Sequence, residues 1–142
     1  YALTAATTAD ELLAELEQEL TRLAETAPEE MDTTLLIHPQ VMTAFLDFHF
    51  FLAEADALIR NLGFEGGFQI ASLQPRYEFA GSEADDIANF TNRSPYPTLH
   101  ILRESSIDRA VAAFPDAESI FERNIETMER LGHEGWKKLW LS

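Results

Sequence analysis

Two short apolar segments, each closed by a proline, constrain the fold of this chain more than any other feature. Residues 33–39 (TTLLIHP) and 66–75 (GGFQIASLQP) are too short for helices and predict strands buried on both faces. Between them, residues 40–62 repeat apolar side chains with the 3.6-residue period of a helix, and Gly63 follows as a stop signal. Because a helical crossover joins strands that run in the same direction, we expect parallel neighbours.

The remaining pattern completes an α/β fold. Further elements are predicted as strands over 1–4 and 98–102, and as helices beginning at Thr8, Ser105 and Asp116, the last followed by an amphipathic tail over 133–142. We therefore expect one α/β domain over residues 1–142, with a small mixed, mainly parallel sheet of about four strands and packed helices. The chain begins at Tyr1 without a methionine, and we expect its N-terminus to be truncated.

Composition excludes several classes of function. The chain has 142 residues, 46% of them hydrophobic, which is enough for one buried core, and no run is long enough to span a membrane. No cysteine is present, so a disulfide framework and a thiolate nucleophile are excluded within this sequence. The net charge of −15 repels phosphate backbones and anionic lipids. We expect a soluble, cytoplasmic protein that binds neither nucleic acid nor membranes.

The two proline-closed strands place polar side chains at a predicted sheet edge. His38 ends the first strand and Gln74 ends the second. Parallel strands bring their carboxyl ends to one edge, where α/β folds bind ligands. We therefore expect His38 and Gln74 to lie close together and to line a concave site.

The segment from Asp86 to Glu104 is typical of a binding loop, because it combines polar side chains with two prolines before an apolar strand. Arg93 and Arg103 are predicted to clamp a small anion in an otherwise acidic chain, with Asn92, Ser94 and Tyr96 orienting it. Ordinary ion pairing with nearby carboxylates is the alternative interpretation of these arginines.

His38 and His100, with Asp86, are the candidates for proton transfer. A histidine at a strand end also often serves as a buried structural group that donates to a backbone carbonyl. Imidazole and carboxylate together suit iron, zinc or manganese, but no short-range spacing of metal ligands is present. Whether a metal or another cofactor binds therefore remains open, as does enzymatic activity itself.

The predicted helix over 40–62 is apolar on more than one side, because Met42, Leu46, Phe50 and Phe51 fall outside its main stripe. Such a surface predicts either enclosure by other layers or contact with a partner, including a second copy of this chain. The alternative to an enzyme-like domain is thus a non-catalytic interaction domain that uses this Phe-rich helix and the tail with Trp136 and Trp140.

Residues 38–47 (HPQVMTAFLD), 69–81 (QIASLQPRYEFAG) and above all 91–104 (TNRSPYPTLHILRE) resemble an uncharacterised proteobacterial family catalogued as domain of unknown function 1415. The resemblance runs nearly end to end and implies no particular activity. It implies an upstream helix with a Cys-Pro-Phe motif, which this sequence lacks, and a histidine at the position of Gln74. A family metal site or acid–base role would therefore differ in this chain.

From these observations, the leading hypothesis is a small enzyme-like domain that binds an anionic small molecule at the carboxyl ends of its strands.

Overall fold

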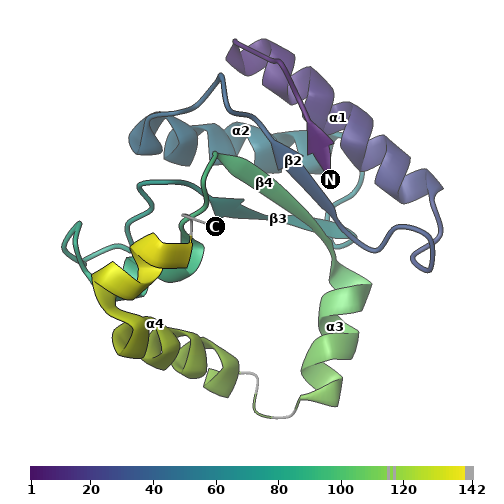
Figure 1. Cartoon of the computed structure of the whole chain (residues 1–142). Helices are drawn as coiled ribbons and strands as arrows, with labels where there is room; N and C mark the ends of the chain where they lie inside the picture. Colours follow the sequence, from purple (N-terminus) through teal and green to yellow (C-terminus); the bar gives the residue numbers. More distant parts are fainter. Residues whose placement is uncertain (115, 117, 140–142) are drawn as a thin grey trace.

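A computed structural model of the chain describes residues 1–114, 116 and 118–139 and shows one sheet with two helices packed against one face (Figure 1). The strands are β1 (Ala2–Leu3), β2 (Thr34–Ile37), β3 (Phe68–Leu73) and β4 (Thr98–Arg103). The helices are α1 (Ala9–Glu25), α2 (Phe45–Asn61), the 3-10 helix η1 (Ile87–Asn92), α3 (Glu104–Ala113) and α4 (Glu118–Leu139). Within the described residues, no helix combines the length and the apolar character that crossing a membrane requires.

The α/β prediction is confirmed, but the prediction of a mainly parallel sheet is wrong. The strand order is β1-β2-β4-β3, in which β1 pairs parallel to β2 while β4 runs antiparallel to both β2 and β3. The crossover through α2 does join two strands of the same direction. However, β4 enters between them, so β2 and β3 are parallel in direction without being neighbours.

The first helix forms where its sequence predicts it. The Thr8 hydroxyl accepts a hydrogen bond from the amide of Glu11 at 3.2 Å, while the Glu11 carboxylate accepts one from the amide of Thr7 at 2.8 Å. Four leucines, at positions 12, 16, 20 and 23, are completely buried on one face. They pack with Leu36, Leu99 and Ile101 of the sheet, and this leucine stripe therefore fixes α1 on the core face.

The second helix is shorter than predicted, because residues 40–44 form a loop before it starts at Phe45. Its buried face contains Phe48, Phe51, Ala55 and Ile59. Of the four apolar residues outside the predicted stripe, Phe51 is buried, whereas Leu46 and Phe50 are 65% and 70% exposed. Association through this helix stays a prediction.

The other face of the sheet is only partly covered. Leu35 is exposed and Ile37 is half-buried, so the prediction that β2 is buried on both faces is wrong. The reason is that α3 and α4 extend away from the sheet instead of packing on it (Figure 1). At Gly132 the backbone of α4 takes φ 64° and ψ 174°, a conformation that essentially only glycine adopts, and the chain bends there.

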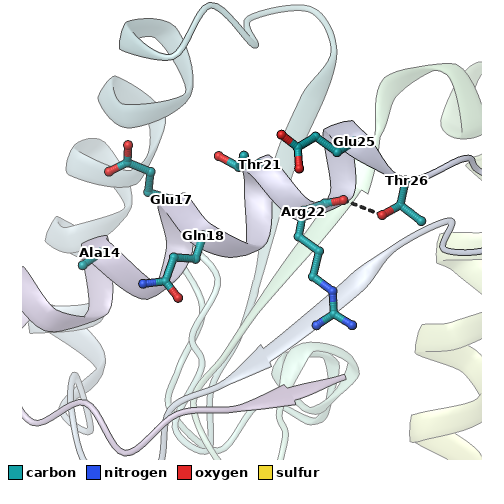
Figure 2. A pocket seen from close by; sticks show the side chains of 7 residues that line it. All are labelled: Ala14, Glu17, Gln18, Thr21, Arg22, Glu25 and Thr26. Carbon is teal, nitrogen blue, oxygen red and sulfur yellow. Dashed lines mark hydrogen bonds between the residues drawn. The ribbon is translucent and has the colours of Figure 1, made fainter.

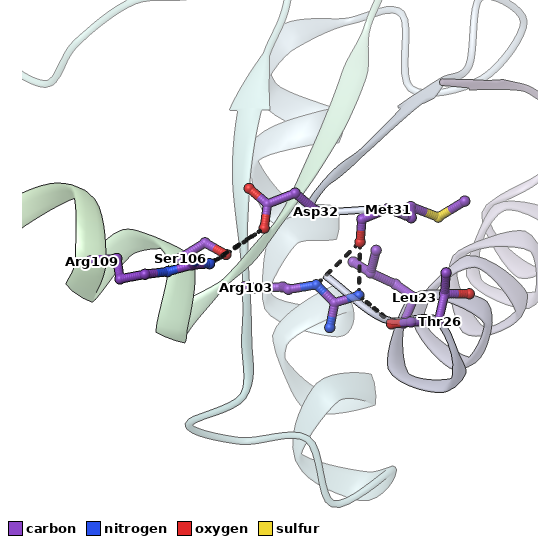
Figure 3. Close-up of polar contacts among 7 residues, drawn as sticks. All are labelled: Leu23, Thr26, Met31, Asp32, Arg103, Ser106 and Arg109. Atoms are coloured by element: carbon purple, nitrogen blue, oxygen red, sulfur yellow. Dashed lines mark hydrogen bonds and ion pairs between the residues drawn. The ribbon is translucent and has the colours of Figure 1, made fainter. Parts of the chain in front are cut away.

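Arg103 holds the end of α1 to the end of β4. Its guanidinium donates hydrogen bonds to the carbonyls of Leu23, Thr26 and Met31 at 2.7 to 2.8 Å (Figure 3). Carbonyls at the end of a helix lack partners within the helix, and a cation there also favours the negative end of the helix dipole. Arg103 is therefore a buried brace of the fold.

We predict that Arg103→Met destabilises the fold by about 2 to 4 kcal/mol, because buried carbonyls lose charge-assisted hydrogen bonds. The matched control is Arg109→Met, since Arg109 is exposed and its nitrogen lies 4.0 Å from the carboxylate of Asp32 (Figure 3). That variant should change stability by less than about 1 kcal/mol. Urea unfolding of both variants measures the difference, and equal losses would show that Arg103 has no special role.

Candidate functional site

The ends of β2 and β3 meet at one edge of the sheet. Ile37 and Leu73, their last residues, both pair with Thr98, the first residue of β4. His38 and Gln74 therefore follow at the same edge, and both are completely buried. Alternation along the strands places them on the face that α1 and α2 cover. The structure thus brings these two side chains to one edge, but under a layer of protein instead of in an open site.

His38 holds the loop that follows it. Its backbone amide donates to the carbonyl of Pro97 at 3.0 Å, and its ring Nδ1 donates to the carbonyl of Val41 at 2.9 Å. Its Nε2 is buried and has no hydrogen-bond partner among the residues that the structure describes. Burial lowers the pKa of His38 below its ordinary value of 6.5, although the bond to Val41 acts in the opposite direction. The ring is therefore neutral at pH 7.

Gln74 connects three segments through one buried amide. The side-chain Nε2 donates to the carbonyl of Thr43 at 2.8 Å, and Oε1 accepts from the backbone amide of Arg76. The backbone amide of Gln74 donates to the carbonyl of Asn92 at 3.2 Å. Gln74 thereby joins the loop before α2, the start of residues 75–86 and the end of η1 to the sheet edge.

Residues 75–86 and η1 form a braced platform. Asn89 is completely buried; its Oδ1 accepts from the amide of Phe79 and the hydroxyl of Ser82, both at 2.9 Å. Its Nδ2 donates to the carbonyl of Glu83 at 2.8 Å. Since every polar atom of this side chain has a partner, Asn89 is a structural residue that shapes the loop.

Arg93 leaves η1 on this platform. Its Nε donates to the carbonyl of Tyr77 at 3.1 Å, an Nη donates to the carbonyl of Ala84 at 2.6 Å, and the guanidinium carbon lies 4.1 Å from the centre of the Phe90 ring. Partial burial lowers the pKa of Arg93, which the negative charge of Glu78 partly offsets. Within the described residues, no carboxylate lies within 4 Å of Arg93.

The end of α4 closes over the same ring. His133 and Trp136 contact Phe90 edge-on, with ring centroids 5.1 and 5.5 Å from it. The bend at Gly132 directs this last part of α4 onto η1. Phe90 therefore lies at the centre of a group formed by a cation, an imidazole and an indole.

Two hollows lie beside this group. The first, which we call the Phe90 pocket, has a volume of about 400 Å³ and is lined by Pro75, Phe90, Arg93, Ser94, Pro95 and Trp136. The second, of about 260 Å³, is lined by Phe90, Thr91, Arg93, Asn124, Thr127, Met128 and Trp136. Both share a guanidinium and two aromatic rings. The Phe90 pocket thus offers apolar walls with a single positive charge.

The predicted proton-transfer residues do not converge there. Asp86 is exposed and caps η1 by accepting from the amide of Ala88 at 3.0 Å. His100 pairs with Leu35 and Ala71 in mid-sheet, on the face opposite to His38, and partial burial lowers its pKa. His38, His100 and Asp86 therefore occupy three different surroundings, and none of them lines the Phe90 pocket.

Only some of the predicted ligand-binding residues line the Phe90 pocket. Arg93 and Ser94 line the pocket, and the hydroxyl of Ser94 donates to the carbonyl of Tyr96 at 2.6 Å. Asn92 and Tyr96 neighbour these residues in the chain without lining the pocket. Arg103 is at the far end of β4 and is engaged by α1, so it does not join Arg93 in a clamp.

A hollow of about 730 Å³ lies along α1, lined by Ala14, Glu17, Gln18, Thr21, Arg22, Glu25 and Thr26 (Figure 2). All of these residues come from one helix and the residue that follows it. Figure 2 shows Glu17 and Glu25 on one side of the helix and Arg22 pointing to the other. The charged side chains of this hollow are thus spread over a solvated helix surface, so we do not regard the hollow as the site.

Among the described residues, no three histidine, aspartate or glutamate side chains are grouped so that they could hold a metal ion.

Phe90 and the two flanking prolines, 75 and 95, are site residues that the sequence did not identify. Phe90 belongs to an irregular segment without periodicity, so no pattern marks which way its ring faces. The only signal was the position of Trp136 after the helix-ending Gly132, which indicates that the tail packs separately from the helix before it.

The family model described as "Protein of unknown function (DUF1415)" matches residues 1–138 of the chain. No curated protein and no solved structure matches the chain.

We predict that His38 makes stability depend on pH. Because burial lowers its pKa in the folded state, the unfolded chain binds a proton first as the pH falls below about 6.5. Neutral His38 therefore makes its full contribution to the free energy of unfolding above that pH. As the pH falls further, this contribution decreases by up to about 1.4 kcal/mol per pH unit until the folded-state pKa is reached. His38→Asn, which keeps a donor for Val41, should lose this part of the dependence.

Urea unfolding between pH 7.5 and 5 measures the free energy of unfolding of the unmodified chain and of His38→Asn. The contribution of His100 has the same sign and is present in both, so it cancels in the difference. Parallel pH profiles for the two chains would contradict the assignment.

Proposed function

Because the chain belongs to the DUF1415 family, whose description gives no activity, we propose a function from its own geometry: it binds a small carboxylate with an apolar body in the Phe90 pocket. The observation that carries this proposal is the position of Arg93 and the absence of a carboxylate beside it in the part of the chain that the structure describes. Its guanidinium is partly buried, is fixed by two backbone carbonyls, and has no carboxylate within 4 Å among the described residues.

The electrostatics of Arg93 favour an anion. A guanidinium has five N–H groups, and the carbonyls of Tyr77 and Ala84 use two of those of Arg93. A carboxylate can accept two parallel hydrogen bonds from such a group, which gives both affinity and orientation. The net charge of −15 repels anions that approach the protein. A ligand must therefore gain enough binding free energy from local contacts to offset this repulsion.

The walls of the pocket supply such contacts. Phe90, Trp136 and the prolines at 75 and 95 make the lining largely apolar, and a volume of about 400 Å³ suits a small organic molecule. An aromatic or branched aliphatic body would bury apolar surface against these rings while its carboxylate meets Arg93. Inorganic anions lack such a body and should bind more weakly.

The proposal is binding, without an assigned reaction. His38 is sealed under the loop before α2, and Asp86 and His100 lie outside the pocket. A group that takes a proton from a ligand must come within hydrogen-bond reach of it. None of these three side chains meets that requirement, so proton transfer does not form part of the proposal.

Benzoate and its neutral counterpart benzamide test the proposal, because they have the same shape and differ in charge. A ligand that binds only the folded state stabilises it by about 2.7 kcal/mol at a hundred times its dissociation constant. We predict that benzoate raises the melting temperature by several degrees and that benzamide raises it much less. Inorganic phosphate should also have a smaller effect than benzoate.

The variant Arg93→Gln should weaken benzoate binding about 10- to 100-fold, which corresponds to the loss of a charge-assisted pair. Because Arg93 also supports the loop, binding is compared by calorimetry below the melting temperature of each variant. The matched control is Arg76→Gln, an exposed arginine of the same segment, which should bind benzoate normally. Equal binding of benzoate and benzamide, or equal binding by both variants, would refute the role of Arg93.

A further inference from the structure

The two outer strands of the sheet differ in how they are protected. β1 has two residues, whereas β3 has six, FQIASL, and contains neither a charge nor a proline. Its register with β4 is continuous from Phe68 to Leu73, so no bulge interrupts it. Edge strands of this kind present unpaired backbone groups to other chains, and proteins usually blunt them by shortening, charge, proline or a bulge. Within the described residues, β3 has none of these features.

The hydrogen-bond pattern shows which part of β3 is free. The amide of Glu104 donates to the carbonyl of Gly67 at 3.0 Å, so these two residues form a hydrogen-bonded pair. Such pairs alternate in an antiparallel ladder, and the backbone groups of Gln69, Ala71 and Leu73 therefore point to β4. Those of Phe68, Ile70 and Ser72 point outward.

Both ends of this outward row are already occupied. The amide of Phe68 donates to the carbonyl of Phe64 at 3.2 Å, and that of Gln74 donates to the carbonyl of Asn92 at 3.2 Å. The amides of Ile70 and Ser72 have no backbone acceptor among the described residues. The free edge is thus a window of three residues, Ile70–Ser72, centred on Ala71.

We propose that a second copy of this chain pairs with this window, antiparallel and about a two-fold axis at Ala71. An antiparallel edge is complementary to itself, because the axis places Ile70 opposite the partner subunit's Ser72 and Ser72 opposite the partner subunit's Ile70. Each of these pairs exchanges two hydrogen bonds, which gives about four across the axis. The two sheets would become one continuous sheet.

The arm formed by α3 and α4 supplies the area that such a short pairing lacks. A stable dimer buries about 800 Å² on each partner, more than three residues of strand provide. Neither helix of the arm has a buried residue, and four of its large apolar side chains are 44% to 59% exposed: Val111, Phe114, Ile120 and Phe121. A half-exposed phenylalanine offers roughly 100 Å². The arm extends past the side of the sheet that ends in β3 (Figure 1).

Charge opposes association through this surface only weakly. Five of the ten lysines and arginines lie on the arm: Arg109, Arg123, Arg130, Lys137 and Lys138. The two helices also carry seven aspartates and glutamates, so seven acids against five bases leave them a net charge of −2. Since β3 itself carries no charge, most of the net charge of −15 lies elsewhere in the chain, and repulsion between two copies at this surface is small. The exposed pair Leu46 and Phe50 on α2 has no comparable backbone edge and does not define a partner.

Sedimentation over a concentration series tests the proposal, and amide hydrogen exchange locates the contact. The chain should form a dimer, and the amides of Ile70 and Ser72 should exchange more slowly as the dimer forms. Ser72→Pro removes one outward N–H without a bond to β4, and Ala71→Lys places two like charges at the axis; each should weaken the dimer at least tenfold. The control Leu3→Lys adds the same charge to β1 and should leave the dimer unchanged.

A strict monomer at all concentrations would overturn the proposal. So would a dimer that survives Ser72→Pro and Ala71→Lys but is lost with Phe50→Ser, since it would use α2 instead. If either β3 variant fails to fold, the exchange of Ile70 and Ser72 in the unmodified chain decides alone. Unchanged exchange of these two amides in a dimer would exclude pairing through β3.

Discussion

The buried amide of Gln74 is the interaction on which the candidate site depends. Through its side chain and backbone it binds the loop before α2, the amide of Arg76 and the carbonyl of Asn92. Segments without regular structure satisfy few of their own polar groups, so a buried hub that pairs with several of them determines their course. The pocket at Phe90 exists because residues 75–93 are fixed at both ends to this one position at the sheet edge.

Arg93 and Arg103 show how position decides the use of the same side chain. Arg103 ends β4 on the core face, where the last carbonyls of α1 need donors, and its charge is used within the fold. Arg93 follows η1, where two carbonyls hold it over Phe90, and its other guanidinium N–H groups have no hydrogen-bond acceptor among the described residues. The first is a structural brace, and the second is the residue to which we assign the carboxylate of the proposed ligand.

Much of the fold follows from local sequence signals, but the site does not. The four leucines of α1 and the cap at Thr8 predict that helix, and the prolines after His38 and Gln74 predict where two strands end at one edge. The place of β4 between β2 and β3 depends on long-range pairing, which local patterns do not contain. Likewise, the buried orientation of His38 and Gln74 depends on the loop that covers them. Histidine and glutamine are equally suited to bind a ligand or to hold a loop in place, and only the contacts of His38 and Gln74 distinguish these two roles.

Amide hydrogen exchange in a Gln74→Met variant tests most directly whether this side chain organises the site. Methionine keeps the length and removes both side-chain hydrogen bonds. If Gln74 is the hub, the amides of Arg76, Phe79 and Arg93 should lose protection together, while amides of α1 keep theirs. Loss of protection at Arg76 alone, its direct partner, would contradict the account, because the platform of Phe79 and Arg93 would then form without Gln74.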